Sequence, residues 1–354
     1  MKTGKVPENV LKRSVLRQLK TERKEIRSGA GVGKDCAIFS FSDGCVISCM
    51  QEAAVEVKTR AGCVPGRHTV AHTMSQLIQK CANNLAASGA EPVAAMVTLF
   101  LPETLEEPEL KALMAETEEK CRELSMAIAG GQTRVMGEIA SPVAVAAGFG
   151  RCLFGNDLSG HAFTAAAPGQ DVVVSKWIGL EGTAFLAEYC GERLRSRYPA
   201  YLVEEAVGFH RYLSILPEAA TAMESGVCAM HDASEGGIFA ALWELAERAG
   251  VGLTIDMKKL PIRQETVEVC ECCNVNPYQL LSGGCLVMTA EDGEKLVESL
   301  HVRQIPAVIV GKVTDSKDRL LLNGEEVRYM DRPTGDELYR FLSGESPLAA
   351  LAKQ

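Results

Sequence analysis

A glycine-rich stretch ending in a lysine and an aspartate, residues 28–41 (SGAGVGKDCAIFSF), is the first with residue types suited to phosphate or metal chemistry. A P-loop would need a glycine at position 28 and a Ser or Thr after the lysine, because that hydroxyl holds Mg²⁺. Here Ser28 replaces the glycine, and Asp35 follows Lys34. A P-loop also follows a strand and opens a helix, whereas this stretch precedes its apolar run. The sequence therefore excludes a Walker motif and leaves a glycine loop with one cation and one carboxylate.

A second candidate is HDASEGG, residues 231–237, which precedes an apolar helical pattern. Asp232 or Ser234 could cap that helix, because such side chains accept from the free N–H groups at a helix start, and Glu235 adds favourable negative charge. Two glycines there would also let a phosphate or a substrate approach the backbone, so both interpretations stay open. A catalytic triad is not indicated, because neighbours on an extended chain face opposite ways and Asp232 is poorly placed to orient His231.

Three further stretches carry polar or sulfur-containing side chains. AGGQTRV, residues 129–135, is expected to break a strand at its double glycine, which either binds an anion or only forms a tight turn. Asn83 and Asn84 lie in a helix of otherwise small residues, where they contact a ligand or hydrogen-bond to another helix. CECC, residues 270–273, does not indicate zinc, because structural zinc usually needs two separated ligand pairs and no matching pair follows.

Composition sets the class of protein. The chain has 354 residues, enough for two ordinary domains, and 47% hydrophobic residues, as in soluble globular proteins. No apolar run approaches the roughly 18–20 residues that span a bilayer, and the N-terminus lacks an apolar signal core. Thirteen scattered cysteines, an odd number, argue against a disulfide framework. We therefore expect a cytoplasmic protein with reduced thiols and no membrane partner.

The charge distribution also restricts the partners. A net charge of −9 argues against nucleic-acid binding by the chain as a whole. Residues 1–27 are an exception, with nine Lys or Arg against three Glu, and Leu11, Val15 and Leu19 fall four apart. This spacing predicts a short amphipathic helix. Its basic residues could attract an anionic partner or a membrane surface, but we expect a docked helix with a solvated basic face.

The elements that must position these residues mix strands and helices in both halves of the chain. In the first half we expect strands at 36–41, 45–50, 93–102, 126–135 and 141–150, and helices at 68–89 and 104–125. In the second half we expect strands at 171–179, 252–257, 283–290 and 305–313, and helices at 180–196, 234–250 and 291–301. This pattern predicts an α+β or α/β protein of two domains, with a boundary near residues 151–168.

The order of these stretches is more specific than any one of them. A Gly-x-Gly-x-Asp-x-Ala loop precedes an Asn-containing helix that ends in GAEP, and then come GGxT, IGLEGTA, HDASEGG and NPYQLLSGG. From about residue 29 to 315, this series resembles the aminoimidazole ribonucleotide synthetase-related superfamily. That group includes selenophosphate synthetase, thiamine-monophosphate kinase and a hydrogenase-maturation protein that dehydrates a carbamoylated cysteine. DVVVSKWIGLEGTAFLAEY and HDASEGGIFAALWELAE make the hydrogenase-maturation branch the closest.

The resemblance implies a fold and a domain organisation. It implies an N-terminal α+β domain whose sheet pairs with its mate in a homodimer, and a C-terminal α/β domain of mixed sheet and helices. The expected divisions are a basic N-terminal extension at 1–28, an ATP-binding-type domain at 29–155, a synthetase-related domain at 165–340 and a tail at 341–354.

The resemblance also implies chemistry. The family activates an acceptor oxygen by phosphoryl transfer from ATP, with Mg²⁺ neutralising the phosphate charge. Asp35 and Asp232 are implied as catalytic and metal-binding residues, and Lys176 as a catalytic residue that faces phosphate. The other implied ATP-binding residues are Gly31, Gly33, Lys34, Asn84, Gly130, Gly131, Gln132, Thr133, Glu181 and Gly182.

The chain departs from the family pattern at several carboxylates. Lys34 replaces one acid of the loop, Gln51 an acid after the next strand, Asn84 an acid of the helix, and Gln132 an Asp or His after the double glycine. Mg²⁺ prefers anionic oxygen ligands, so the reduced set weakens a metal site, although Lys34 could face a phosphate directly. The tail SGESPLAALAKQ has no cysteine, so we do not expect carbamoyl dehydration.

Two functions follow from these observations. The first is a homodimeric enzyme that binds ATP and Mg²⁺ and transfers a phosphoryl group to an unidentified small-molecule acceptor. The alternative is a non-catalytic relative that binds a nucleotide or metabolite and regulates or scaffolds a partner. The replaced carboxylates favour the alternative, and the retained glycine loops favour the enzyme.

Overall fold

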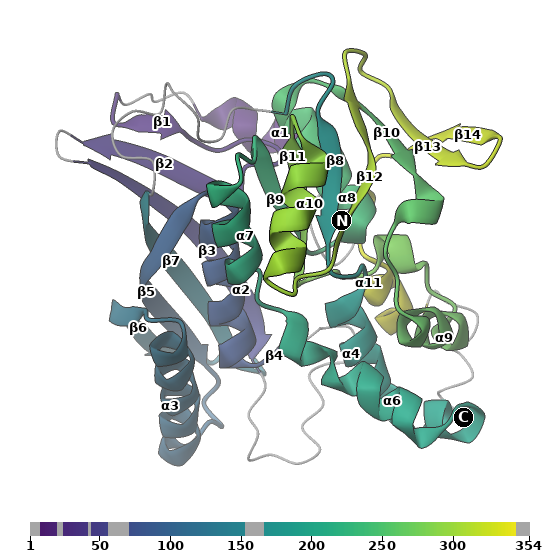
Figure 1. The fold of residues 1–354 in the computed structure, drawn as a ribbon. Helices are drawn as coiled ribbons and strands as arrows, with labels where there is room; N and C mark the ends of the chain where they lie inside the picture. The colour runs from purple at the N-terminus through teal and green to yellow at the C-terminus, as the bar shows by residue number, and fades with distance from the viewer. Residues whose placement is uncertain (1–7, 20–23, 42–43, 56–70, 153–165, 345–354) are drawn as a thin grey trace. The chain divides into compact units, whose positions relative to one another are not determined.

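The computed structural model describes residues 8–19, 24–41, 44–55, 71–152 and 166–344 (Figure 1). Contacts within the chain divide it into two compact units. We call Met1–Thr21, Gly31–Lys34 and Asp157–Gln354 the larger unit, and Glu22–Ala30 and Asp35–Asn156 the smaller unit. The glycine loop therefore groups with the larger unit, although the residues on both sides of it belong to the smaller one.

The smaller unit is built on one sheet. Its strands are β1 (Ile26–Ser28), β2 (Cys36–Phe41), β3 (Gly44–Val55), β4 (Ala71–His72), β5 (Ala90–Leu101), β6 (Ala127–Val135) and β7 (Val143–Cys152). They run in the order β1-β2-β3-β7-β5-β6, with β4 paired to β3. Neighbours from β1 to β5 along this order are antiparallel, whereas β5 and β6 are parallel. A parallel pair needs a crossover, which α3 (Glu107–Glu123) provides.

Helix α2 (Met74–Ala87) covers one face of this sheet and contacts β3, β5 and β7. Because side chains alternate along a strand, Ile47 and Leu99 are fully buried. Met50 and Met96 point the other way and are 64% and 45% exposed. Ala147 of β7 is the Cα partner of both methionines. An apolar row, Met50–Ala147–Met96, therefore crosses the second face.

The larger unit is built on a second sheet. Its strands are β8 (Asp171–Ser175), β9 (Ala229–Ala233), β10 (Gly252–Asp256), β11 (Cys285–Ala290), β12 (Ala307–Thr314), β13 (Arg319–Asn323) and β14 (Glu326–Tyr329). They run in the order β14-β13-β10-β12-β8-β11-β9, and only β10 and β13 form a parallel pair among these neighbours.

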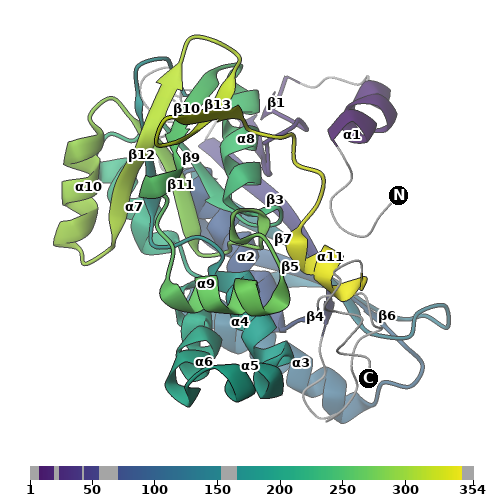
Figure 2. The same ribbon diagram turned by 90° about the vertical axis from the view of Figure 1, so that its right-hand side faces the viewer.

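Helices cover both faces of this second sheet, with α8 (Gly237–Ala249) on one side and α7 (Leu216–Glu224) and α10 (Gly293–Val302) on the other (Figure 2). Val172 and Val174 join the core beneath α8, and Val173 faces the opposite side; all three have no exposed surface. A run of valines buried on both faces is typical of a central strand.

The remaining helices of the larger unit are short. They are α4 (Leu180–Tyr189), α5 (Gly191–Arg197), α6 (Ala200–Val207), α9 (Gln264–Cys273) and α11 (Glu337–Leu342). The single helix expected at 180–196 is thus two helices that meet at Cys190. No helix among the described residues is long and apolar enough to cross a membrane.

The N-terminal helix α1 (Glu8–Ser14) docks on the larger unit, as expected, but through polar contacts. The indole N–H of Trp243 donates to Glu8 at 3.0 Å, and Lys12 pairs with Glu247 at 2.5 Å. Val15 and Leu19, expected on its apolar stripe, are 46% and 58% exposed. The predicted helix is therefore present, but the predicted buried stripe is wrong.

Candidate functional site

Two motifs leave the larger sheet at the same edge. Strands β8 and β9 both pair antiparallel with β11, so they run parallel to each other. Asp232 of β9 is the Cα partner of Leu286, and the hydroxyl of Ser175, at the end of β8, accepts from the Leu286 N–H at 3.1 Å. The segment with IGLEGTA and the segment with SEGG therefore begin side by side.

The loop NPYQLLSGG joins these two segments. The Ser282 hydroxyl accepts from the Gly179 N–H at 2.8 Å, and the Leu281 carbonyl accepts from the Gly182 N–H at 2.8 Å. The Ser282 N–H in turn donates to the Ser234 carbonyl at 3.2 Å. Hydrogen bonds thus connect three motifs that are spread over about a hundred residues of the sequence. We call this cluster the motif junction: residues 178–184, 231–237 and 276–284.

Close packing explains two glycines of the motif junction. A Cβ on Gly237, whose φ is +69°, would lie 2.6 Å from the Tyr278 carbonyl oxygen and 2.8 Å from that of Leu280. A Cβ on Gly182 would lie 2.5 Å from the Leu280 side chain. All three distances are far shorter than real carbon contacts. Gly237 therefore lets backbone approach backbone, and Gly182 leaves room for the Leu280 side chain.

The helix cap at HDASEGG differs from the prediction. Helix α8 begins at Gly237, Gly236 is its N-cap with φ +87°, and His231 and Asp232 lie in β9. Neither Asp232 nor Ser234 caps the helix, because the strand continues through Ala233 before the turn. Instead the Asp336 carboxylate, a hundred residues later, accepts from the Gly236 N–H at 2.6 Å.

Asp336 is buried, and burial raises the pKa of its carboxyl to about 7, with a further contribution from the negative charge of Glu235. Hydrogen bonds from the N–H groups of Leu338, Gly236 and Leu281 oppose this shift, because they favour the ionised form. Asp336 also caps α11, by accepting from Leu338 N–H at 2.8 Å.

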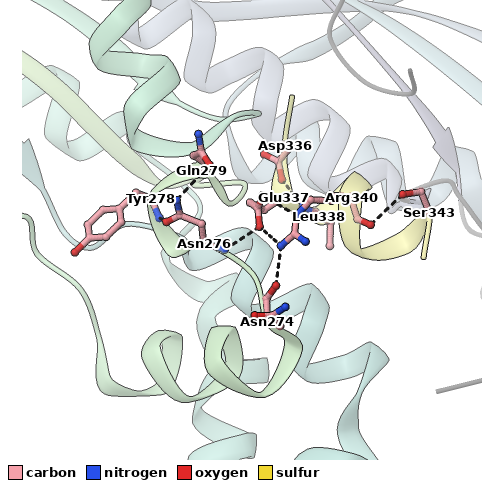
Figure 3. A network of polar contacts seen from close by, with 9 residues as sticks. All are labelled: Asn274, Asn276, Tyr278, Gln279, Asp336, Glu337, Leu338, Arg340 and Ser343. Carbon is pink, nitrogen blue, oxygen red and sulfur yellow. Dashed lines mark hydrogen bonds and ion pairs between the residues drawn. The ribbon is translucent and has the colours of Figure 1, made fainter. Parts of the chain in front are cut away.

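Helix α11 holds the NPYQLLSGG loop through a second set of contacts (Figure 3). The Glu337 carboxylate accepts from the Asn276 N–H at 2.9 Å, and Arg340 donates to the Asn274 carbonyl at 2.7 Å. Arg340 and Glu337 also bind each other, at 2.8 Å. The last described helix therefore supports the motif junction through an ion pair of its own and two contacts with backbone groups.

The glycine loop lies against α8. Gly33 has φ +67°, and a Cβ there would come within 2.4 Å of the Glu244 carbonyl oxygen, so the loop backbone touches the helix. The Glu244 carboxylate also binds His231 Nε2 at 3.0 Å. Lys34 and Asp35 are exposed. Within the larger unit, the structure thus brings Gly33 and His231 to the same residue of α8, although they are 198 positions apart.

Lys176 has its protons directed at protein oxygens. Its Nζ donates to the carbonyls of Tyr212 at 2.8 Å and Ser214 at 2.6 Å, and it pairs with Glu218 at 2.6 Å. The lysine and the glutamate are both buried. Three acceptors use the three donors of an ammonium group, so we do not carry Lys176 forward as a phosphate ligand.

Glu181 lies in the first turn of α4 and is buried. Its carboxylate lies against the motif junction, because a Cβ on Gly283 would come within 2.2 Å of Glu181 Oε2. Glu181 is thus placed to support the SGG segment.

In the smaller unit, the start of β2 meets α2. Cys36 Sγ donates to the Asn84 carbonyl at 3.3 Å, which places Asp35, the preceding residue, next to this contact along the chain. Asn84 is buried, and the neighbouring Asn83 accepts from Gln79 of the same helix at 2.9 Å. For Asn83 the structure therefore shows a hydrogen bond within its own helix.

The sequence led us to expect that the double glycine of AGGQTRV breaks the strand. The structure shows that it does not. Gly130, Gly131, Gln132 and Thr133 all lie in β6, at the edge of the smaller sheet, and are exposed. The register of β5 and β6 shifts at this point, and a Cβ on Gly131 would lie 1.8 Å from the Val97 carbonyl oxygen. A close approach between parallel strands therefore explains the glycine.

The described residues contain no group of three or more His, Cys, Asp or Glu side chains arranged to hold a metal ion. In the CECC stretch, Cys270, Cys272 and Cys273 are buried in α9. Mg²⁺ bound to nucleotide usually needs only one or two protein carboxylates, since phosphates and water supply the other ligands. The chain therefore fits a metal that arrives with a nucleotide, with Asp35 as an exposed carboxylate.

Three residues connect the motifs, and their connecting role was not predicted from the sequence: Asp336, Ser282 and Glu244. The only local signal was at Asp336, which precedes ELYRFL as helix-capping aspartates do. Its partner Gly236 lies a hundred residues away, and no spacing in the sequence indicates that pair.

Comparison with known proteins identifies the family. Residues 33–152 match the AIR synthase related protein N-terminal domain, and residues 167–322 match its C-terminal domain. The chain belongs to the AIR synthase-related family. The predicted fold class, two domains that each combine a sheet with helices, is confirmed.

Two relatives place the chain within this family. It is 25% identical over 346 residues, 95% of this chain and 96% of the relative, to a Methanocaldococcus jannaschii protein named for hydrogenase expression and formation. It is also 28% identical over 236 residues to the carbamoyl dehydratase HypE of Rhodobacter capsulatus. This match covers 65% of this chain and 66% of that protein. The predicted resemblance to hydrogenase-maturation proteins is confirmed.

Solved structures show the same fold. A structure of the hydrogenase maturation protein HypE in complex with ATP matches with a TM-score of 0.67 at 17% identity, covering 94% of this chain and 96% of that one. A ThiL structure complexed with AMPPCP and TMP matches with a TM-score of 0.68 at 19% identity, covering 92% and 96%. Both neighbours, according to their descriptions, bind a nucleotide.

Proposed function

We propose that this chain binds ATP and transfers a phosphoryl group to an oxygen of a small-molecule acceptor. The observation that carries the proposal is the position of the glycine loop. Gly33 touches Glu244, which binds His231, so the loop lies beside the segment that carries Asp232. The nucleotide complexes of HypE and ThiL, which share the fold, support a nucleotide as the ligand.

In this proposal, the exposed Lys34 binds phosphate oxygens and Asp35 binds the metal that accompanies them. Lysine binds phosphate as a point charge. In this proposal the N–H groups of Gly31 and Gly33 also approach the phosphate, which a side chain at either position would obstruct. Mg²⁺, when bound, neutralises phosphate charge and favours transfer of the terminal phosphoryl group. Asn84, Gln132 and Thr133 of the smaller unit are further candidates for nucleotide contacts. In the larger unit, Asp232 is a second candidate metal ligand, and Glu181 and Gly182 hold the motif junction.

We also propose that the protein is a homodimer, formed through the open face of the smaller sheet. The row Met50–Ala147–Met96 presents apolar side chains on neighbouring strands, and Val93 of β5 is 48% exposed. A second copy would present the same row, as a twofold interface requires. Light scattering of the purified protein tests this, and Met50→Asp should convert a dimer to a monomer.

A thermal-shift titration tests nucleotide binding. ATP and ADP are added with and without Mg²⁺, because a ligand at about 100 times its Kd stabilises the folded state by roughly 2.7 kcal/mol. We expect a rise in melting temperature with ATP that increases when Mg²⁺ is present. Lys34→Ala should reduce the rise in both conditions, whereas Asp35→Asn should remove only the part that depends on Mg²⁺.

Matched controls keep this result specific. Lys317→Ala and Asp315→Asn change exposed residues of the same types elsewhere in the larger unit and should leave the titration unchanged. No shift with any nucleotide would refute the proposal. Nucleotide-dependent shifts without phosphate release, across a panel of hydroxyl, carboxylate and amide acceptors, would instead support a non-catalytic nucleotide-binding protein.

Two observations favour that second function. Lys176 pairs with Glu218, and the described residues hold no preformed metal cluster. A protein that only binds nucleotide needs neither a catalytic lysine nor a metal cluster.

A further inference from the structure

Two cysteine thiols from different helices touch within the larger unit. Cys190 follows α4 and Cys273 ends α9, and the Cys273 thiol donates to Cys190 Sγ at 3.8 Å. A disulfide bond is about 2.05 Å long, so the two sulfur atoms need to approach by about 1.8 Å. Cys190 is half-buried, and Cys273 is buried. Of the two residues, Cys190 is therefore the one with surface exposed to solvent.

The surroundings favour the thiolate form of Cys190. The hydrogen bond from Cys273 lowers the pKa of Cys190, and the charge of Arg193 lowers it further, although burial opposes both. Arg193 is held there because its guanidinium donates to the Cys272 carbonyl at 2.7 Å. The thiolate is the reactive form of cysteine, so Cys190 is the nucleophile of the pair and Cys273 the second thiol.

Four other thiols in the described chain have a raised pKa, which makes the thiolate form less available. Cys45 is also half-buried, but burial raises its pKa to about 11. Cys285 is completely buried, which raises its pKa to about 12. Cys36 and Cys49 are directly opposite on β2 and β3, but both are buried and both have a raised pKa. The Cys190–Cys273 pair alone among these combines contact, access and a lowered pKa.

We propose that Cys190 and Cys273 form a reversible oxidation site, which a peroxide converts to a disulfide. The Cys190 thiolate attacks one peroxide oxygen, the O–O bond breaks, hydroxide leaves and Cys190 becomes a sulfenic acid. The Cys273 sulfur then attacks the sulfenic sulfur, so that the S–S bond forms and the S–O bond breaks. The leaving hydroxide takes the Cys273 proton, and the first hydroxide takes the proton that Cys190 released. Two thiols thus lose two electrons, and one hydrogen peroxide becomes two water molecules.

The bond would connect α4 and α9, two helices that adjoin the motif junction. Helix α4 begins within IGLEGTA, and Cys273 directly precedes Asn274, whose carbonyl accepts from Arg340 of α11. The link closes a loop of 83 residues along the chain, which restricts the unfolded state more than the folded one. We therefore expect oxidation to raise the melting temperature of the larger unit and dithiothreitol to reverse the change.

Peptide mapping of the full chain tests the site. Reduced protein is treated with a few molar equivalents of hydrogen peroxide, blocked with N-ethylmaleimide and digested with trypsin. The expected product is peptide 177–193 linked to peptide 264–295, with N-ethylmaleimide on the other three cysteines of the second peptide and about 2 Da lost where the disulfide has formed. Cys190→Ser and Cys273→Ser should abolish it. Cys272→Ser and Cys285→Ser are matched controls within the same tryptic peptide and should retain it.

Two results would overturn the proposal. One is the absence of the linked peptide at peroxide doses that convert Cys190 to a sulfenic acid, as trapped by dimedone. The other is a linked peptide that persists in Cys273→Ser, which would assign the bond to another cysteine. If Cys273→Ser does not fold, fragmentation of the linked wild-type peptide identifies the bridging cysteine directly.

Discussion

The two sheets of this protein bury their surfaces in different ways. Strand β8 of the larger sheet has helices on both sides, and Val172, Val173 and Val174 have no exposed surface. In the part of the chain that the structure describes, α2 packs on one face of the smaller sheet, and the other face exposes Met50 and Met96. The larger sheet completes its core with its own helices. The smaller sheet keeps an apolar face, which is why we place the homodimer contact there.

The largest expected effect comes from placing a carboxylate on each sheet. Val173→Asp should unfold the larger unit, or cost at least about 4 kcal/mol, because a buried charge loses its hydration without gaining a partner. Met50→Asp should cost less than about 1 kcal/mol in the isolated chain, since the site is open to water. Urea unfolding followed by circular dichroism measures both. Equal losses in the two variants would remove the contrast between the sheets.

A smaller effect distinguishes packing from backbone conformation within the larger unit. Gly237 and Gly250 have nearly the same φ, +69° and +70°, but a Cβ would meet three backbone atoms at Gly237 and nothing within 4 Å at Gly250. We expect Gly250→Ala to cost about 1 kcal/mol and Gly237→Ala roughly 2–4 kcal/mol. Similar unfolding midpoints in urea would mean that the motif junction is looser than described.

The next effect depends on pH. Between its usual pKa of 3.8 and about 7, the Asp336 carboxyl holds a proton in the folded protein that the unfolded chain lacks. Stability therefore falls as pH rises through this window, by up to about 1.4 kcal/mol per pH unit. Asp336→Asn should remove that part of the slope. Unfolding free energies at several pH values show it, and parallel curves for variant and wild type would contradict the assignment.

The smallest expected effect is at α1. Lys12→Ala removes the contacts with Glu247 and Glu8, but the lysine side chain is 46% exposed, so we expect a loss of no more than about 1 kcal/mol. The loss should shrink at high salt, because screening weakens exposed ion pairs. A larger loss that is independent of salt would mean that α1 contributes apolar packing to the larger unit.

Much of the fold could be predicted from patterns within a few residues. The alternation in CVISCM, the helical spacing of Ile238, Leu242 and Leu245, and the hairpin between residues 41 and 44 depend on near neighbours, and the structure has all three. The order of the motifs also indicated the family. These features are local, or they are carried by sequence order alone.

The predictions that were wrong concern contacts between distant residues. The break at Gly130 and Gly131 was expected because a double glycine is typical of a turn, whereas the approach of Val97 is what requires it. The cap of α8 was assigned to Asp232 or Ser234 because no local pattern indicates Asp336. The resemblance implied that Lys176 faces phosphate, and this role stays a prediction; its ion pair with Glu218, 42 residues later, is another contact that no local pattern indicates. Tertiary contacts decide each of these positions.

The grouping of Gly31–Lys34 and α1 with the larger unit has a consequence for synthesis on the ribosome. Residues 35–156 of the smaller unit follow one another along the chain, so it can fold soon after they emerge. The larger unit is interrupted by this segment, so it can complete its fold only after its later residues have been translated. Its N-terminal helix finds Trp243 and Glu247 only after more than two hundred further residues have been translated, and Gly236 acquires its cap only at Asp336. Helix α1 is therefore translated early but is among the last segments to reach its native contacts.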